Sequence, residues 1–242
     1  MTTTCDFTGL RAAITGGTSG LGLALVDELL GRGARVAFVA RTRSAVELVS
    51  AERPHVHGIV GDVSNVNQIH PIALQILGRL GGLDVLVNSA SHLGPVPLAL
   101  LADTECEDFE RALATNVLGP FRLTKALLGS LAASAREGRG AVVLNVSSDA
   151  AVNAYPRWGA YGASKAALHH LSRIWNDELI ADGVRVLSID PGDMDTPLHA
   201  AAVPDADRSQ LKRPVTAARE LADAIAAALA AIADLSVGNE SR

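Results

Sequence analysis

Tyr161 and Lys165 stand four residues apart in a segment whose apolar pattern predicts a buried helix, so their side chains share one helix face. A lysine ammonium held against a tyrosine favours the phenolate, and the phenol then exchanges its proton more readily near neutral pH. Such a pair can move a proton on and off an alcohol oxygen. The same spacing on an exposed helix is usually no more than a solvated pair, so other segments must decide between the two interpretations.

Short apolar segments alternate with helical patterns along the whole chain. The predicted strands, rich in Val, Ile and Leu, span 11–15, 35–40, 56–60, 83–88, 141–147 and 184–190. The predicted helices span 21–30, 44–52, 66–80, 107–131, 161–181 and 217–232. This alternation predicts a doubly wound, Rossmann-like parallel sheet of six to seven strands with helices on both faces, in one α/β domain over residues 1–242. The only long irregular segment expected, 191–214, is interpreted as a substrate-binding loop.

Composition narrows the class of protein. Of 242 residues, 48% are hydrophobic and 19% charged, which indicates a large buried core. The net charge of -5, without any run of Lys or Arg, argues against nucleic acid or an anionic membrane as partner and favours a small molecule. We expect a cytoplasmic protein, because the N-terminus has no signal-peptide pattern and the longest apolar stretch, 224–233, is too short to span a bilayer. Cys5 and Cys106 suggest neither a disulfide nor a metal site.

A run of small residues joins the first predicted strand to the first helix. It reads Thr15-Gly-Gly-Thr-Ser-Gly-Leu-Gly22, which differs from the G-x-G-x-x-G dinucleotide fingerprint because Leu25 stands where that pattern needs a small residue. Small residues let the backbone approach a pyrophosphate, and the free N–H groups of the helix start attract its charge. A tight turn without a ligand is the alternative, but the position at the first strand-to-helix turn favours a cofactor. The predicted cofactor contacts are Gly16, Thr18, Ser19, Gly20, Leu21 and Gly22.

Arg41 follows the second predicted strand, about 20 positions after the glycine turn. An acidic residue there would accept hydrogen bonds from the adenosine ribose, whereas an arginine pairs with a 2′-phosphate. The acid is missing and the arginine is present. The sequence therefore predicts NADPH over NADH, the alternative being a solvated arginine on an exposed turn.

Together these motifs resemble the short-chain dehydrogenase/reductase family, and the resemblance covers nearly the whole chain. The glycine turn matches that family's T-G-x-x-x-G-x-G motif. Ser148 lies thirteen positions before Tyr161, the spacing usual for the catalytic serine. Pro191-Gly192 followed by Thr196 resembles the family's P-G-x-x-x-T segment beside the nicotinamide.

Further matches follow the order of the family's motifs. Asp62-Val63 is similar to its adenine-contacting pair, and Asn116 to the asparagine of its N-x-x-G helix element. Asn88 and Ala90 match two positions of the N-N-A-G motif that contacts the cofactor. The resemblance implies an NADP(H)-dependent oxidoreductase that reduces a ketone or aldehyde carbonyl to an alcohol, reversibly.

The resemblance also implies a role for each of four residues. Tyr161 would donate its proton to the substrate oxygen as hydride reaches the carbon. Lys165 would lower the pKa of the tyrosine and hydrogen-bond the nicotinamide ribose. Ser148 would hold the carbonyl oxygen as a neutral donor aimed at developing negative charge. Asn116 would fix a water that connects Lys165 to solvent.

Each assignment has a plainer alternative. Ser147 could be the functional hydroxyl, although the spacing favours Ser148. Asp62 could cap the helix that follows it, because Asp62-Val-Ser-Asn65 is rich in capping residues. Asn116 could be an ordinary polar residue of a helix.

Two segments depart from the family's pattern. Ser91 stands where N-N-A-G ends in glycine, so the local turn is expected to differ, and His92 beside it either faces the substrate or is a solvated loop residue. The C-terminal residues 236–242 contain nothing like the family's V-D-G-G strand, which puts a seventh strand in doubt.

The long helices 107–131 and 161–181 are expected to form the family's four-helix contact between two subunits. Their small residues Ala112, Ala166 and Ala167 would allow close approach. A homodimer is favoured over a tetramer.

The substrate pocket is expected to hold residues next to the catalytic positions and the loop 193–213. Arg157 and Trp158 suggest a polar, acidic or flat group on the substrate, the alternative being a solvated arginine and a tryptophan at a subunit boundary. The other predicted lining residues are Leu93, Ser148, Ala150, Val152 and Asn153.

Two rival functions on the same fold are weighed against a reductase. A halohydrin-type lyase typically lacks the glycine turn and carries Arg in place of Lys165, whereas this chain keeps both turn and lysine. A cofactor-binding regulator without turnover tends to lose the tyrosine or the lysine, and here neither is lost.

Overall fold

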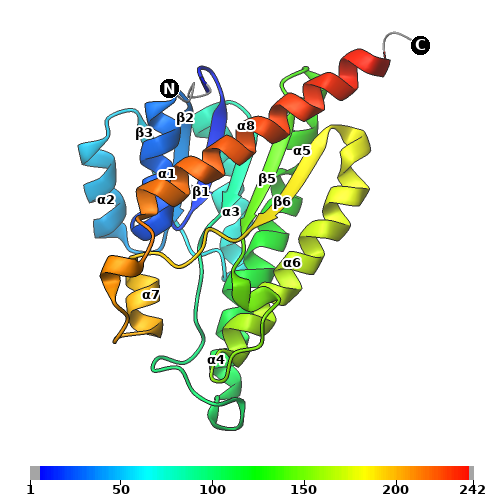
Figure 1. Cartoon of the computed structure of the whole chain (residues 1–242). Coiled ribbons are helices and arrows are strands. Elements are labelled where there is room, and N and C mark those ends of the chain that lie inside the picture. Colours follow the sequence, from blue (N-terminus) through cyan, green and yellow to red (C-terminus); the bar gives the residue numbers. More distant parts are fainter. Residues whose placement is uncertain (1–5, 240–242) are drawn as a thin grey trace.

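The computed structural model describes residues 6–239, which form one six-stranded parallel sheet in the order β3-β2-β1-β4-β5-β6 (Figure 1). The predicted doubly wound α/β fold is confirmed. The strand order reverses between β1 and β4, and crossovers on opposite faces leave a crevice at the carboxyl ends of these strands. The strands are β1 (Arg11–Thr15), β2 (Arg35–Ala40), β3 (Val56–Val60), β4 (Val85–Asn88), β5 (Ala141–Val146) and β6 (Val184–Ile189).

Helices cover both faces of the sheet. On one face, α1, α2 and α8 pack over β1 and its neighbours, and on the other face α3, α5 and α6 do so. Figure 1 shows α8 crossing the sheet beside α1. The helices are α1 (Gly20–Gly31), α2 (Arg43–Glu52), α3 (Val66–Leu80), α4 (Cys106–Leu113), α5 (Gly119–Arg136), α6 (Gly159–Leu179), α7 (Pro197–Ala202) and α8 (Pro214–Asn239).

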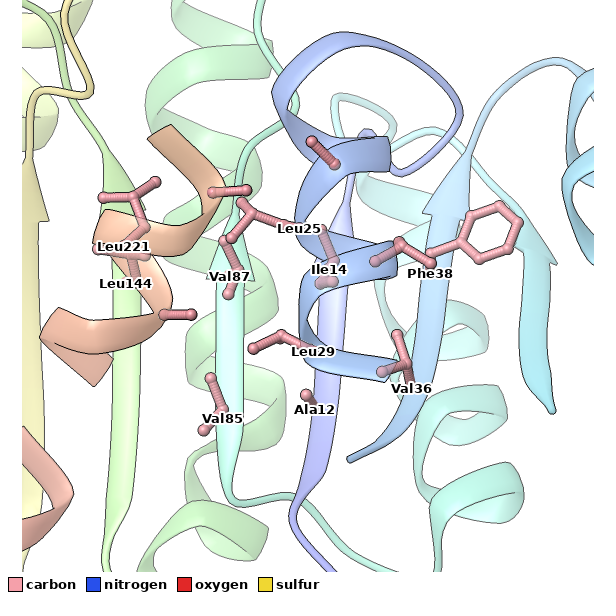
Figure 2. Packing of buried hydrophobic residues seen from close by; sticks show 14 of the residues in the cluster. Ala12, Ile14, Leu25, Leu29, Val36, Phe38, Val85, Val87, Leu144 and Leu221 are labelled. Atoms are coloured by element: carbon pink, nitrogen blue, oxygen red, sulfur yellow. The ribbon is translucent and has the colours of Figure 1, made fainter. Parts of the chain in front are cut away.

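The two cores follow from the alternation of side chains along each strand. Ala12 and Ile14 of β1 face α1, whereas Ala13 between them faces the opposite layer. Figure 2 shows Leu25 and Leu29 of α1 lying over the strands, between the side chains of β2 and β4. All of these residues are buried, and burying such apolar side chains is the main stabilisation of the sheet.

The single helix predicted over 107–131 is wrong, because the chain forms two helices joined by a π-helical segment, Ala114–Leu118. Pro120 has no N–H with which to bond the carbonyl of Asn116, so a regular α-helical ladder cannot continue there. Widened turns of this kind often occur at functional sites. The apolar periodicity alone did not reveal this interruption.

Irregular segments also differ from expectation. The segment 191–214 contains α7 and a short 3-10 turn, Arg208–Gln210, and a second long segment without α-helix or strand, 89–105, connects β4 to α4. The helix predicted over 217–232 runs on to Asn239, so the described part of the chain has six strands, and residues 240–242 of the C-terminal segment lie outside it. Within residues 6–239, no helix is both long and apolar enough to cross a membrane.

A buried carboxylate joins the amino ends of the central strands, opposite the crevice. Asp84, just before β4, accepts hydrogen bonds from the backbone N–H and guanidinium of Arg11, both at 2.7 Å, from Arg139 at 3.0 Å and from the Ser134 hydroxyl. Burial opposes ionisation of Asp84, but these donors outweigh it and hold its pKa well below the usual range. The network joins β1, β4 and α5 far from the crevice.

Replacing this carboxylate should destabilise the fold. Asp84→Asn is expected to lower the free energy of unfolding at pH 7 by about 3 kcal/mol, because it leaves Arg11 and Arg139 partly buried without their anion. Since the folded-state pKa is depressed, the stabilisation is fully present above the pKa of an unfolded Asp and is lost as the pH falls below it. Denaturant titrations of wild type and variant should therefore converge in acid. Glu47→Gln is the control, because Glu47 forms only an exposed pair with Arg43 at 3.9 Å. A constant difference from neutral to acid pH would contradict this account.

Candidate active site

A cavity of about 970 Å³ opens at the carboxyl ends of the strands, and it collects most of the residues that the sequence singled out. Its wall is built from the β1-to-α1 turn, the ends of β2 to β6, the start of α6 and the helix α7. The predicted residues that line it are Gly16, Thr18, Ser19, Gly20, Leu21, Gly22, Arg41, Asp62, Val63, Ala90, Ser148, Tyr161, Lys165, Pro191, Gly192 and Thr196.

The glycine turn is packed too closely for side chains. Gly16 has a φ of +75°, and a Cβ on it would lie 3.0 Å from the Cα of Ala90. A Cβ on Gly22 would collide with the carbonyl oxygen of Gly16. Ser19 precedes α1 without capping it through its side chain, and no acidic residue occupies the first turn. The N–H groups at the start of α1 are therefore available to an anion such as a pyrophosphate.

The far end of the cavity presents a cation. Arg41 is exposed at the end of β2, lines the cavity and makes no hydrogen bond or ion pair with any residue in 6–239. Asp62, after β3, accepts hydrogen bonds from the N–H and hydroxyl of Ser64 at 2.9 and 2.7 Å. The cap of α3 is Asn65, which accepts from the N–H of Asn67, so Asp62 does not cap that helix.

Tyr161 and Lys165 are both buried at the start of α6, with 7% and 3% of their surfaces exposed, so they are not a solvated pair. The Lys165 Nζ lies 5.5 Å from the centre of the tyrosine ring and donates a hydrogen bond to the Val146 carbonyl at 2.8 Å. Trp158 meets the same ring edge to face at 5.6 Å. The three side chains bring the end of β5 and the start of α6 to one wall of the cavity.

Burial moves both pKa values. It lowers the pKa of Lys165 to about 8, and it raises the pKa of Tyr161 to about 12 although the Ser148 and Ser91 hydroxyls act to lower it. The tyrosine pKa is thus raised in the protein alone, because desolvation of the phenolate is the largest effect on it, and the influence expected of Lys165 stays a prediction. The phenol is protonated at neutral pH, which is the state required of a proton donor.

Ser148 is the serine that acts on the phenol. It follows β5, accepts a hydrogen bond from the Ala150 N–H at 3.2 Å, lines the cavity and lowers the pKa of Tyr161. Ser147 also borders the cavity, but its own contact is a backbone hydrogen bond to Ile189. Between the two serines, the geometry favours Ser148.

Asn88 and Asn116 lie behind the cavity wall. The Asn88 amide donates to Asn145 at 2.8 Å within the sheet. Asn116, 1% exposed on the π-helical segment, exchanges hydrogen bonds at 2.8 Å with the backbone N–H and carbonyl of His92. Asn116 is therefore not an ordinary polar residue on a helix surface. Its predicted role with water and the cofactor contact predicted for Asn88 stay predictions.

The substrate end differs from expectation. Leu93, Ala150 and Trp158 line the cavity as predicted. The first half of the predicted loop 193–213 also lines it, up to Val203. Val152 is 73% exposed and, like Asn153 and Arg157, is not part of the wall. Arg157 instead sits in a turn with a φ of +73°. The polar or acidic substrate group inferred from this arginine has no support in the geometry.

Several lining residues were missed. His92 was not among them: it lines the cavity, in line with one of its two sequence interpretations, and its Nδ1 accepts from the Gly94 N–H at 3.0 Å, while burial lowers its pKa. Thr196-Pro197, an N-cap residue followed by proline at the first helical position, was the available signal for α7. The lining residues outside the predicted positions and the predicted loop include Val96, Asp108, Arg111 and Tyr155.

With this geometry established, comparison with known proteins defines the class. The family model described as short chain dehydrogenase matches residues 11–207. The chain is 35% identical over 192 residues to an uncharacterized oxidoreductase of Thermotoga maritima, covering 77% of this chain and 72% of that one. It is 32% identical to the 2-(R)-hydroxypropyl-CoM dehydrogenase of Xanthobacter autotrophicus, covering 77% and 75%. Three mycobacterial oxidoreductases are each 34% identical to this chain, but the match covers only 56% of the length of each of them.

Solved structures agree. An alcohol dehydrogenase of Thermococcus sibiricus complexed with 5-hydroxy-NADP superposes with a TM-score of 0.78 at 27% identity, covering 88% of this chain and 89% of that one. A 3-ketoacyl-(acyl-carrier-protein) reductase of Brucella melitensis complexed with NADH gives 0.82 at 25% identity, covering 91% of each. The chain belongs to the short-chain dehydrogenase family, oxidoreductases that act on CH–OH groups or carbonyls with a nicotinamide cofactor.

The crowding of the glycine turn gives a direct test. Gly22→Ala is expected to raise the Kd for the nicotinamide cofactor at least tenfold or to prevent folding, because the new Cβ displaces the Gly16 carbonyl. Gly31→Ala, at the other end of the same helix, is the matched control, since a Cβ there meets nothing within 4 Å. Calorimetric titration and thermal melts of both variants measure the difference. Equal behaviour of the two variants would show that the turn has room for a side chain.

Proposed function

We propose that the protein is an NADPH-dependent oxidoreductase that reduces a ketone or aldehyde to an alcohol, reversibly, with Tyr161 as the acid and base. The observation that carries the proposal is the buried Tyr161, which shares one cavity wall with Ser148 and the buried Lys165. An isolated buried tyrosine would be an ordinary core residue, but this one faces a cavity beside a buried lysine. Perturbed titratable groups in a cavity are typical of active sites.

The residues present fit the cofactor. The uncapped start of α1 and the side-chain-free approach of Gly16 and Gly22 suit the pyrophosphate. Arg41 suits a 2′-phosphate, since it is an unpaired cation among the described residues, and Asp62 with Val63 would hold the adenine. The other residues that would hold the cofactor are Thr18, Ser19, Gly20, Leu21, Ala90, Lys165, Pro191, Gly192 and Thr196.

When bound, NADPH supplies the hydride. Tyr161, protonated at neutral pH, donates its proton to the carbonyl oxygen of the substrate. Ser148 donates a hydrogen bond to the same oxygen and so stabilises the charge that develops on it. Lys165, anchored on the Val146 carbonyl, places a partly desolvated cation behind the phenol. Its pKa of about 8 makes the ammonium the prevalent form at neutral pH, which favours transient loss of the Tyr161 proton.

The shape of the cavity suggests an apolar substituent on the substrate. Leu93, Ala150 and Tyr161 form a small buried cluster, against which Trp158 of α6 and residues of α7 pack. Polar side chains line the cavity around it, among them His92, Asp149, Tyr155 and His199, and Tyr155 donates a hydrogen bond to Asp149 at 2.7 Å. Ligand sites typically combine such apolar walls with a few convergent polar groups.

A homodimer through α5 and α6 remains part of the proposal, as does a cytoplasmic location. Phe121 and Trp175 stack with ring centres 5.3 Å apart, and Ile174 is exposed beside them. Ala112, however, is fully buried within the chain, so the small residues left for close contact are Ala166 and Ala167.

Cofactor preference tests the assignment of Arg41. The kcat/KM of wild type is expected to be higher with NADPH than with NADH. Arg41→Ala should lower it by about 10- to 100-fold with NADPH, while leaving the NADH value nearly unchanged, because only the 2′-phosphate loses its ion pair. Arg43→Ala is the matched control, an exposed arginine of the same turn outside the cavity wall. A native preference for NADH would sink the NADPH assignment.

The reaction itself is tested by NADPH oxidation with a panel of ketones and aldehydes. Tyr161→Phe should lower kcat at least about 100-fold, because the acid is removed while the ring is kept. Tyr155→Phe, the protein's other tyrosine, should keep turnover. A wild type that binds NADPH tightly yet turns over no substrate in a broad panel would favour a regulator instead.

A further inference from the structure

A carboxylate stands next to the serine that is proposed to hold the substrate oxygen. Asp149 follows Ser148 directly and begins the short 3-10 turn Asp149–Ala151 after β5. The Ser148 Oγ donates a hydrogen bond to the Oδ1 of Asp149 at 3.3 Å, and the Tyr155 hydroxyl donates one to its Oδ2 at 2.7 Å. All three side chains line the cavity. The carboxylate is therefore held beside the point where the substrate oxygen would lie.

The negative charge of Asp149 has no cation against it. Both of its side-chain donors are neutral hydroxyls, and within residues 6–239 it forms no ion pair. A carboxylate offers about four lone-pair sites, so some of them stay open to a further donor. Because Asp149 is half-buried, its charge is screened less than that of a side chain in bulk water.

The cations of the cavity wall are engaged elsewhere. Among the described residues, the wall holds three lysine or arginine side chains: Arg41, Arg111 and Lys165. Arg111 of α4 pairs with Asp108, and the other two are assigned above to the cofactor. None of the three forms an ion pair with Asp149. A cation that neutralises this carboxylate would therefore have to come with the ligand.

The charge of the surrounding wall has the same sign. Asp190 and Asp193 line the cavity after β6, and both are exposed. Arg157, from which the sequence suggested an acidic group on the substrate, is not part of the wall. An anionic substituent would be repelled at this end of the cavity, whereas a cationic one would be attracted.

The position of the carboxylate limits where such a cation can stand on the substrate. An oxygen held by the Ser148 hydroxyl at an ordinary distance lies at most about 6 Å from the Asp149 Oδ1. An ammonium must come within about 2.8 Å of that same Oδ1. An amino group on the first or second carbon from the carbonyl spans the gap between the two oxygens.

The carboxylate also competes with the substrate for the serine proton. Ser148 has a single hydroxyl proton, which in this structure is directed at Asp149. In the proposed reaction the same proton must face the carbonyl oxygen of the substrate. A charged acceptor binds it more strongly than a neutral carbonyl does. An ammonium bonded to Asp149 weakens this competition, so a cationic substrate would free the serine proton for its own carbonyl.

We propose that the substrate carries a protonated amino group one or two carbons from its carbonyl, and that Asp149 binds this ammonium and so determines specificity. The other substituent of the carbonyl would lie against the apolar cluster of Leu93 and Trp158. The inference rests on the proposed function for the carbonyl and adds the class of substrate, an amino ketone or the corresponding amino alcohol.

Three ketones of nearly equal size test the charge. In 3-aminopropiophenone, 3-hydroxypropiophenone and butyrophenone, the second carbon from the carbonyl carries an ammonium, a hydroxyl or a methyl group. At pH 7 with saturating NADPH, the kcat/KM of wild type should be at least about tenfold higher for the ammonium ketone than for butyrophenone. Equal values for the ammonium and hydroxyl ketones would overturn the proposal, because a neutral donor would then suffice.

Asp149→Asn removes the charge while keeping the shape of the side chain and an acceptor oxygen. In this variant the ratio of kcat/KM between the ammonium ketone and butyrophenone should fall to about one. Asp193→Asn is the matched control, because the Asp193 side chain lines the same cavity but is 80% exposed, where water screens its charge. It should keep most of the ratio. A ratio that survives Asp149→Asn, or that falls as far in Asp193→Asn, would overturn the assignment.

Binding separates this inference from the proposed function. Calorimetric titration of the NADP-saturated protein gives a Kd for each ketone without any turnover. If no ketone is reduced, the proposed function fails; tighter binding of 3-aminopropiophenone than of butyrophenone, lost in Asp149→Asn, would still support the ammonium site. Equal binding of the two ketones by wild type would overturn that site as well.

Discussion

Burying Tyr161 and Lys165 within one turn of α6 costs free energy unless hydrogen bonds replace the water that each loses. The structure meets this demand from the ends of two strands. β5 supplies the Val146 carbonyl to the ammonium and leads through Ser147 into Ser148, while the chain leaving β4 places Ser91 on the same cavity wall, and both serines lower the pKa of Tyr161. Because β4 and β5 pair in parallel with Asn88 opposite Asn145, both strands end at the same level beside one phenol. The parallel register is the condition on which the site depends.

A layer of polar contacts behind the cavity holds these strand ends in place. Asn145 links Asn88 on β4 to Ser172 on α6, so the hydrogen bonds run from strand to strand and on to a helix. About two turns nearer the start of α6, Asn116 ties the backbone of His92 to Ser164. Asn116 is buried on the π-helical segment, and Pro120, which has no N–H for the Asn116 carbonyl, accounts for the interrupted α-helical ladder there. The hydrogen bonds of Asn116, on this irregular segment, thus hold the backbone of the loop that follows β4.

Electrostatics divide the cavity into regions with different tasks. The start of α1, which has no side-chain cap, and Arg41, which has no ion-pair partner among residues 6–239, are suited to phosphate groups, the buried phenol and ammonium occupy the middle, and Leu93 and Trp158 pack in an apolar cluster. The carboxylate of Asp84, which is stabilised by hydrogen bonds from Arg11, lies at the other ends of the strands, away from the cavity. Stability and binding are thus assigned to different ends of the strands, which leaves the cavity end free to carry costly polar groups.

Much of the fold follows from the sequence alone. Arg11–Thr15, Arg35–Ala40 and Val56–Val60 have the predicted strand bounds, and the glycine turn and the Tyr161–Lys165 spacing fall where expected, because apolar periods and turn residues are local signals. The interrupted helix at Ala114–Leu118, the outward turn at Arg157, the place of Ser91 on the cavity wall and the direction of the tyrosine pKa were decided by tertiary structure. Each depends on burial or on a partner distant in the chain, and no local pattern records how much water a side chain loses when the layers close over it.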